Sequence, residues 1–276
     1  LGSQAGATRA FLERSGVDLG ECLEAPDRLD TARKLFERQI RYWDCRPMPD
    51  EPDIAVCPAD ARVLVGSLCD VSSLYLKNKF FDLEELLGRD RQSWCRVFEA
   101  GDFAILRLTP EKYHYTHVPA AGRVADVYEI PGCYHSCNPG AVVAVVTPHS
   151  KNRRVVTILD TDVPAGSGLG LVAMIEVAAL MVGDIVQRYS AERYLEPQPV
   201  RRDMFLRRGA PKTLFRPGGS TVVLFFQPGR IAFTDDIVAN MLRADIKSRF
   251  SHGFGRPLVE TDVMVRSPLA QAAGRR

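Results

Sequence analysis

The sequence has little net charge and no long hydrophobic run. Its 36 Lys and Arg residues nearly balance 34 Asp and Glu residues, so the formal net charge is +2 over 276 residues. Such a balance gives no signal for a polyanion partner, and we expect no binding to nucleic acid. No uninterrupted stretch of about 18 apolar residues occurs, so no membrane-spanning helix is predicted. The N-terminal residues lack the basic-then-apolar pattern of a secretory signal, and a cytoplasmic location is expected.

Cysteines are few, and their spacing is not that of a disulfide-stabilised protein. The seven cysteines are scattered along the chain, which favours reduced thiols in a reducing compartment. The one cluster is "CYHSC", with Cys133, His135 and Cys137. A zinc site there is conceivable, but no second ligand pair lies at finger spacing. An alternating strand, which would put the three side chains on one face, is the simpler interpretation. We therefore predict no metal.

The N-terminal part of the chain has a helical texture that ends at a proline-rich segment. Residues 4–43 are predicted to be helical, with an apolar stripe over 29–43. Three prolines in the nine residues of 45–53 mark a linker. The predicted organisation is an N-terminal helical segment over 1–50 and a catalytic domain over 51–276.

Short β-rich stretches follow the linker. The predicted strands cover residues 61–68, 103–108, 141–147, 153–161 and much of 213–233. The apolar stretch 170–189 is interrupted by Glu176 and Asp184, so it suits a packed core element, either helix or strand. Residues 235–250 form an amphipathic piece, and the tail 267–276 is predicted to be frayed. The expected fold class is α+β, with a β-rich barrel-like or sandwich-like core and flanking helices.

The segment "PGGSTVVLFF" at 217–226 places a hydroxyl directly after two glycines and before a buried strand. A serine can attack a carbonyl only when a base, usually histidine oriented by a carboxylate, takes its proton. The segment "EKYHYTHVPAAG" offers His114 and His117, and "CPADARV" offers Asp60 at the start of a strand. Taken singly, each pattern is more often structural: a backbone-bound histidine or a turn.

Taken in order, these blocks have a family likeness. The series "CPADARV", "YHYTHVPAAGRV", "YHSCNPGAVVAVV", "KNRRVV" and "PGGSTVVLFF" resembles the phosphatidylserine decarboxylase family over about residues 55–235. The resemblance implies a proenzyme that cuts itself between Gly219 and Ser220. The Ser220 hydroxyl would attack the carbonyl of Gly219, and the new N-terminus would become a pyruvoyl cofactor.

The same resemblance implies roles for the neighbouring groups. His117 would take the proton of Ser220, Asp60 would orient His117, and a strained Gly-Gly bond would favour the cut. His114 would serve the later decarboxylation as proton donor or substrate holder.

The chain departs from the family pattern beside these residues. Asp60 is followed by Ala61 where the family has glycine, and Tyr115 stands where the family has arginine, which removes a cation. Arg153 replaces a glutamate of the family pattern. The substrate-proximal candidates are Tyr115, Asn138 and Thr221.

The expected function is pyruvoyl-dependent decarboxylation, foremost of phosphatidylserine to phosphatidylethanolamine. The alternatives are decarboxylation of a soluble amino acid, and a binding domain that retains the fold without the chemistry. A conventional serine hydrolase is disfavoured because Gly-Gly-Ser-Thr before a strand is not a nucleophile elbow. After the cut, the large and small chains are expected to stay associated, with a homodimer as a further association.

A phospholipid substrate implies access to a bilayer. Residues 29–43, with Tyr42 and Trp43, suit peripheral contact with the inner membrane face. A second basic and aromatic patch comprises Lys77, Lys79, Phe80 and Phe81. The alternative for both is packing against the protein's own domain.

Overall fold

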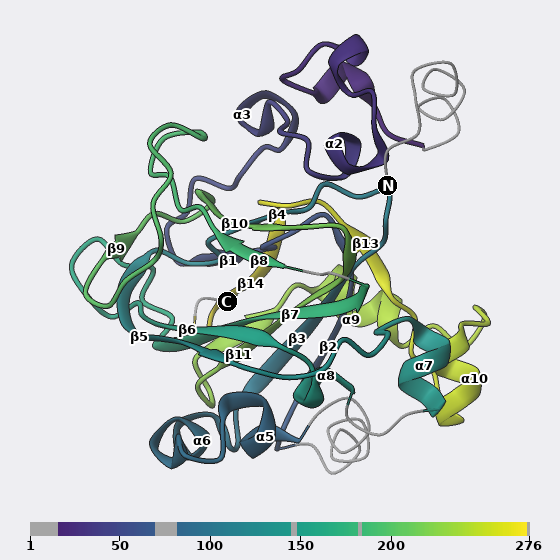
Figure 1. The fold of residues 1–276 in the computed structure, drawn as a ribbon. Helices are drawn as coiled ribbons and strands as arrows, with labels where there is room; N and C mark the ends of the chain where they lie inside the picture. The colour runs from purple at the N-terminus through teal and green to yellow at the C-terminus, as the bar shows by residue number, and fades with distance from the viewer. Residues whose placement is uncertain (1–15, 70–81, 145–147, 182–183, 275–276) are drawn as a thin grey trace.

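The computed structural model describes residues 16–69, 82–144, 148–181 and 184–274, and its centre is a large antiparallel sheet (Figure 1). Every neighbouring pair in this eight-stranded sheet is antiparallel. In spatial order the strands are β13 (Thr261–Val263), β2 (Ala61–Ser67), β3 (Asp102–Leu108), β11 (Gly218–Phe226), β7 (Leu171–Met181), β6 (Arg154–Asp160), β5 (Gly122–Ile130) and β9 (Phe205–Leu206).

Two three-stranded sheets pack on one face of the large sheet. The first has the order β1 (Ile54–Val56), β14 (Pro268–Ala272), β12 (Ile231–Phe233). The second has the order β4 (Tyr115–His117), β10 (Pro211–Phe215), β8 (Ile185–Gln187). One hydrophobic cluster joins all three sheets, with Ala270, Phe215 and Val222 among its members. This packing confirms the predicted sandwich-like, β-rich core.

Helices cover the other face of the large sheet, where Figure 1 draws α5 and α6 below the strands. Leu86 and Phe98 from these helices share a second cluster with Val223 and Phe225 of β11. Phe250 extends this cluster toward a further helix. The helices after the linker are α5 (Leu83–Leu87), α6 (Gln92–Phe98), α7 (Pro139–Ala144), α8 (Pro148–Lys151), α9 (Asp235–Met241) and α10 (Arg249–Phe254).

Strand β11 is buried on both faces because it lies between β3 and β7. Val222 and Leu224 point into the cluster shared with the small sheets, and Val223 and Phe225 point toward the helices. This double burial explains why the sequence of β11 is continuously apolar rather than alternating. Since side chains alternate along a strand, Ser220 lies on the face of Val222, toward the small sheets.

The N-terminal segment is not the long helix predicted for 4–43. Within residues 16–50 the structure has only short pieces: η2 (Leu19–Glu21), η3 (Pro26–Arg28), α2 (Ala32–Phe36) and α3 (Tyr42–Cys45). A β-bridge between Cys22 and Ile40 folds the segment back on itself, and Cys22 packs with Leu29 and Leu35 in a small core. Tertiary packing therefore interrupts the helical periodicity. Residues 1–15 lie outside the described part of the chain.

Several further predictions differ from the structure. The predicted strand 141–147 is helix α7 over its described part, and "CYHSC" is a loop that makes one bridge from Cys133 to Asn152. The tail is not frayed, because β14 pairs with both β1 and β12. The apolar stretch 170–189, for which the sequence allows either helix or strand, contains strands β7 and β8. Among the described residues, no helix is both long and apolar enough to cross a bilayer.

Candidate active site

Ser220 lies near the start of β11, opposite Leu108 of β3 and Ala178 of β7. Its side chain is buried, and its Oγ has no hydrogen-bond partner. A buried hydroxyl without a partner is costly and calls for an explanation, of which a catalytic role is one.

Gly219 is required by close packing rather than by backbone strain. A Cβ at this position would lie 3.1 Å from Cβ of Ala179, tighter than most side-chain contacts. The pairing of β11 with β7 shifts register between Gly218 and Gly219, and neither glycine has a positive φ. The expected strain in the Gly-Gly bond is therefore not visible in the backbone angles.

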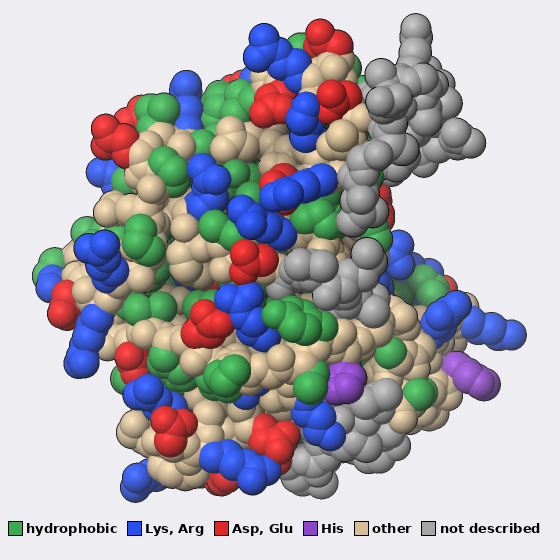
Figure 2. Space-filling model, viewed as in Figure 1, with side chains coloured by type: hydrophobic (Ala, Val, Ile, Leu, Met, Phe, Trp, Pro, Cys, Tyr) green, Lys and Arg blue, Asp and Glu red, His purple; other side chains and the backbone are tan. Residues whose placement is uncertain are grey.

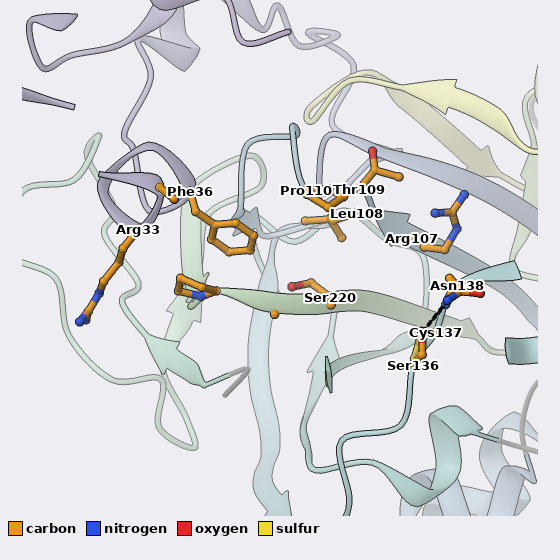
Figure 3. A pocket seen from close by; sticks show the side chains of 14 residues that line it. Arg33, Phe36, Arg107, Leu108, Thr109, Pro110, Ser136, Cys137, Asn138 and Ser220 are labelled. Carbon is orange, nitrogen blue, oxygen red and sulfur yellow. Dashed lines mark hydrogen bonds between the residues drawn. The ribbon is translucent and has the colours of Figure 1, made fainter. Parts of the chain in front are cut away.

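A cavity of about 370 Å³ opens beside Ser220. Four separate segments line it: Ala32, Arg33 and Phe36 of α2; residues 107–110 at the end of β3; residues 136–138 before α7; and residues 217–220. Figure 3 shows Ser220 between Phe36 on one side and Arg107 and Asn138 on the other. The segment before the linker therefore forms part of the site.

The cavity walls are mainly apolar, with few polar groups in defined positions. Asn138 Nδ2 donates to Ser136 Oγ at 2.8 Å, and Asn138 Oδ1 accepts from the Ala141 backbone at 2.9 Å. The Arg107 guanidinium binds Glu260 through two bonds of 3.0 and 2.8 Å. Burial raises the pKa of the Cys137 thiol to about 12, so this cysteine is neutral at pH 7. Asn138, one of the substrate-proximal candidates, therefore lines the cavity.

His114 is buried next to the cavity under Phe36. The two rings stack with centroids 3.5 Å apart, and Phe36 itself lines the cavity. Nδ1 lies 2.8 Å from the Lys112 carbonyl, which can only accept, so the proton is on Nδ1. Nε2 is buried without a partner. Burial, and then the charge of Arg38, lower the pKa of His114 to about 3, so Nε2 carries a free lone pair at neutral pH.

His117 is buried too, but both of its ring nitrogens are occupied. Nδ1 donates to the Gly209 carbonyl at 2.8 Å, and Nε2 accepts from the Tyr113 hydroxyl at 3.0 Å. The Tyr113 hydroxyl in turn lies 2.7 Å from that of Tyr194. Burial is the main cause that lowers the pKa of His117 to about 3.

Asp60 is held by a cation that the sequence did not indicate. Arg46, from the linker, binds both Asp60 oxygens, at 3.0 and 2.8 Å, and also binds Glu21. The Val265 amide donates to Asp60 Oδ1 at 2.7 Å. Asp60 acts on His117 only through its charge, which opposes the lowering of the histidine's pKa. Among the described residues, no hydrogen bond joins Asp60 to His117 or His117 to Ser220.

A buried ion pair connects the histidine-bearing sheet to the serine-bearing sheet. Lys212 of β10 and Glu176 of β7 have fully buried side chains and are joined at 2.6 Å. Thr116, between the two histidines, donates to the other Glu176 oxygen at 2.6 Å, and Gln187 donates to the carboxylate at 3.3 Å. The only sequence signal was Glu176 interrupting an apolar stretch.

The other two substrate-proximal candidates are not among the residues that line the cavity. Tyr115 packs into an aromatic cluster with Tyr113 and Tyr194, and its hydroxyl accepts from Gln39 at 3.1 Å. Thr221 points to the opposite face of β11 from Ser220, toward Cys137. Among the described residues, no three potential metal ligands lie close enough together to hold an ion. Cys133, His135 and Cys137 do not form such a group either.

This arrangement can be compared with known proteins. The family model described as phosphatidylserine decarboxylase matches residues 32–250, which include the cavity, both histidines and Ser220. The chain belongs to the phosphatidylserine decarboxylase family. It is therefore a carboxy-lyase of phospholipid biosynthesis, from a family whose curated members are named proenzymes.

The relatives match over most of this chain. The phosphatidylserine decarboxylase proenzyme of Bordetella petrii is 34% identical over 238 residues, 82% of this chain and 79% of the relative. The proenzyme of Chlamydia trachomatis serovar D is 38% identical over 205 residues, 74% of this chain and 62% of the relative. Proenzyme 2 of Oryza sativa subsp. japonica is 33% identical over 242 residues, 85% of this chain but 35% of the rice protein.

Proposed function

We propose that this member of the phosphatidylserine decarboxylase family cuts itself between Gly219 and Ser220 and then converts phosphatidylserine to phosphatidylethanolamine. The observation that carries the proposal is the buried, unpartnered Ser220 hydroxyl beside an apolar cavity. Gly219 directly precedes Ser220, so the carbonyl that would be attacked belongs to the adjoining residue, which has no side chain to shield it.

The proposed cut needs no reactant other than the chain itself and one water molecule, and it releases ammonia. The Ser220 oxygen adds to the Gly219 carbonyl carbon, and the bond from that carbon to the Ser220 nitrogen breaks, which gives an ester. Elimination removes the proton from Cα of residue 220 to a base and breaks the bond between the ester oxygen and Cβ, leaving a carboxylate on Gly219 and dehydroalanine at residue 220. After tautomerisation to an imine, water displaces ammonia and the residue becomes a pyruvoyl group.

The pyruvoyl carbonyl supplies a site for the substrate amine and withdraws electrons from the bond to the departing carboxylate. His114, which stacks on the cavity-lining Phe36, has a free nitrogen. Because Nε2 is unprotonated, His114 must first take a proton, for which the substrate ammonium is a source, and then deliver it to the carbon that lost carbon dioxide. The apolar cavity walls exclude water from that carbon.

We assign the cut to His117 and Asp60 and the decarboxylation to His114. Because the ring proton is on Nδ1, His117 can take a proton only at Nε2, and only after Nε2 exchanges the Tyr113 hydroxyl for a new partner. Asp60 and Arg46 then hold the polypeptide around His117 rather than relay a proton.

The proposal is tested on the purified full chain. A denaturing gel should show two pieces, residues 1–219 and 220–276, and mass spectrometry should find a carbonyl-bearing, blocked N-terminus on the smaller one. Ser220→Ala should leave one full-length band, whereas the matched change Thr221→Ser should still be cut. An uncut wild-type chain with an unmodified serine would contradict the proposal.

The identity of the substrate needs a separate assay. Release of carbon dioxide should be fast with phosphatidylserine and slow with free serine or tryptophan, because the free amino acids cannot fill an apolar cavity of this size. Faster turnover of a free amino acid would favour the alternative substrate class within the same family.

A further inference from the structure

A second cavity, of about 430 Å³, lies next to the active-site cavity and has a strongly cationic lining. Arg107 lines both cavities, and Asn138 of the first is followed directly by Pro139 of the second. The charged residues around the second cavity are Arg62, Arg107, Lys247, Arg249 and Glu260. Four cations therefore face one carboxylate, and that carboxylate is already bound by Arg107 through two hydrogen bonds.

The remaining three cations have no acidic partner in the described part of the chain. Arg62, Lys247 and Arg249 are exposed, and none of them is in an ion pair with a described carboxylate. Asp262, the strand partner of Arg62, is bound by Lys112 instead. Unpaired cations that converge on a cavity attract an anion, and guanidinium groups suit phosphate oxygens in particular.

The cationic surface continues beyond one cavity. Lys247 and Ser248 also line a neighbouring cavity of about 510 Å³, together with Arg243, His252 and Arg256. Of these, Arg243 is already paired with Asp245, so Lys247 is the cation shared by the two cavities. In Figure 2, Lys and Arg side chains project from the edge of the molecule where Figure 1 draws α10. Leu242, beside Arg243, has 59% of its surface exposed, so an apolar side chain projects among the cations.

We propose that this surface, centred on Arg62, Lys247 and Arg249, binds the phosphate groups of anionic lipids in a bilayer and so holds the active-site cavity at the membrane. The inference rests on the proposed lipid substrate. A single substrate molecule has one phosphate, whereas the cations span two adjoining cavities, so their extent fits a lipid surface with several headgroups. Mixed cationic and apolar side chains are the pattern by which proteins attach to anionic bilayers.

The test measures binding to vesicles that contain no substrate. Vesicles of phosphatidylglycerol and phosphatidylcholine are sedimented with wild type, with Lys247→Glu/Arg249→Glu and with the control Arg201→Glu/Arg202→Glu. The control makes the same charge change with exposed arginines next to β9, at the other end of the large sheet. We expect the first variant to partition at least about tenfold more weakly and the control to stay within about twofold of wild type. High salt should weaken wild-type binding most.

Turnover separates the lipid surface from a substrate subsite. The Lys247→Glu/Arg249→Glu variant should lose turnover of phosphatidylserine in vesicles but keep that of short-chain phosphatidylserine dispersed as monomers. Unchanged vesicle binding would overturn the proposal, and so would equal loss with both substrates, which would assign the cations to the substrate's own phosphate. Vesicle binding by the Ser220→Ala chain makes the result independent of whether the protein cuts itself or decarboxylates. An unchanged thermal unfolding midpoint serves as the folding control.

Discussion

Strand β11 of the large sheet and the small sheet of β4, β10 and β8 satisfy their polar groups in opposite ways. On the large sheet, Ser220 sits in an apolar strand and its hydroxyl has no partner. On the small sheet, His117, Thr116 and Lys212 are each bound by at least one specific group. His114 combines both conditions, since one nitrogen is held and the other is free. The proposed chemistry begins at the free Ser220 Oγ and His114 Nε2, and the hydrogen-bonded groups hold the geometry.

The largest effects should come from separating the two histidines. His117→Ala should block the cut, and His114→Ala should still be cut but lose about 10²–10⁴-fold in turnover, the usual contribution of general acid–base catalysis. Gels score the cut, and carbon dioxide release scores turnover. If His114→Ala remained one band while His117→Ala was cut, the free nitrogen of His114 would be the base for Ser220, and our assignment would be reversed.

Breaking the buried ion pair between Lys212 and Glu176 should destabilise the fold where the small sheet meets β7. Lys212→Met leaves the carboxylate of Glu176 buried without its cation and should lower the free energy of unfolding by about 3–5 kcal/mol. Urea unfolding in a Ser220→Ala background measures this without fragments. The control is Arg89→Met, which removes an exposed partner of Glu85 and should cost no more than about 0.5 kcal/mol.

The hydroxyl of Thr116 offers a smaller change at the same place. Thr116→Val removes one hydrogen bond to a buried carboxylate and should cost about 1.5–3 kcal/mol. Thr157 supplies a matched control, because it is equally buried on β6 and its hydroxyl has no partner. Thr157→Val should therefore be neutral or slightly stabilising. Equal losses in the two variants would mean that the bond to Glu176 contributes nothing specific.

Acid should weaken the fold through the buried histidines. Their pKa values are about 3 in the folded chain and near 6.5 when unfolded, so the unfolded state binds more protons between these limits. Stability is complete above about pH 6.5 and falls on acidification by about 1.4 kcal/mol per pH unit for each histidine. In the uncut Ser220→Ala background, His114→Gln should remove one such increment from the slope between pH 6 and 4.

The sequence predicts the central strand and the close approach at its start well because both depend on local pattern. The apolar run of β11 indicates burial whatever its neighbours are, and the glycines before Ser220 mark a close approach. The valines of α7 favour a strand by propensity, and the prediction of a strand over 141–147 is therefore wrong. The sequence nevertheless indicates where this helix begins, because Asn138 accepts a hydrogen bond from the Ala141 amide and Pro139 lies in the first turn.

Features that depend on distant partners could not be predicted in this way. The tail is ordered by β1 and β12, which lie far from it in sequence. Arg46 looks like a linker residue until folding brings it to Asp60. Likewise, the aromatic pair Tyr42 and Trp43, expected at a membrane, is turned inward: Tyr42 is buried, and Trp43 lies under the Arg193 guanidinium. The expected patch at Lys77, Lys79, Phe80 and Phe81 lies outside the described residues.

The position of β11 in the middle of the large sheet has a consequence for assembly. Residues 220–276 contribute this inner strand, an edge strand of the same sheet and the middle strand of a small sheet, so they are interwoven with the rest of the chain. The proposed scission at residue 220 would therefore have to follow folding. Once unfolded, a severed protein would need two molecules to find each other, and its recovery would depend on concentration, whereas the intact precursor would renature as a single polypeptide.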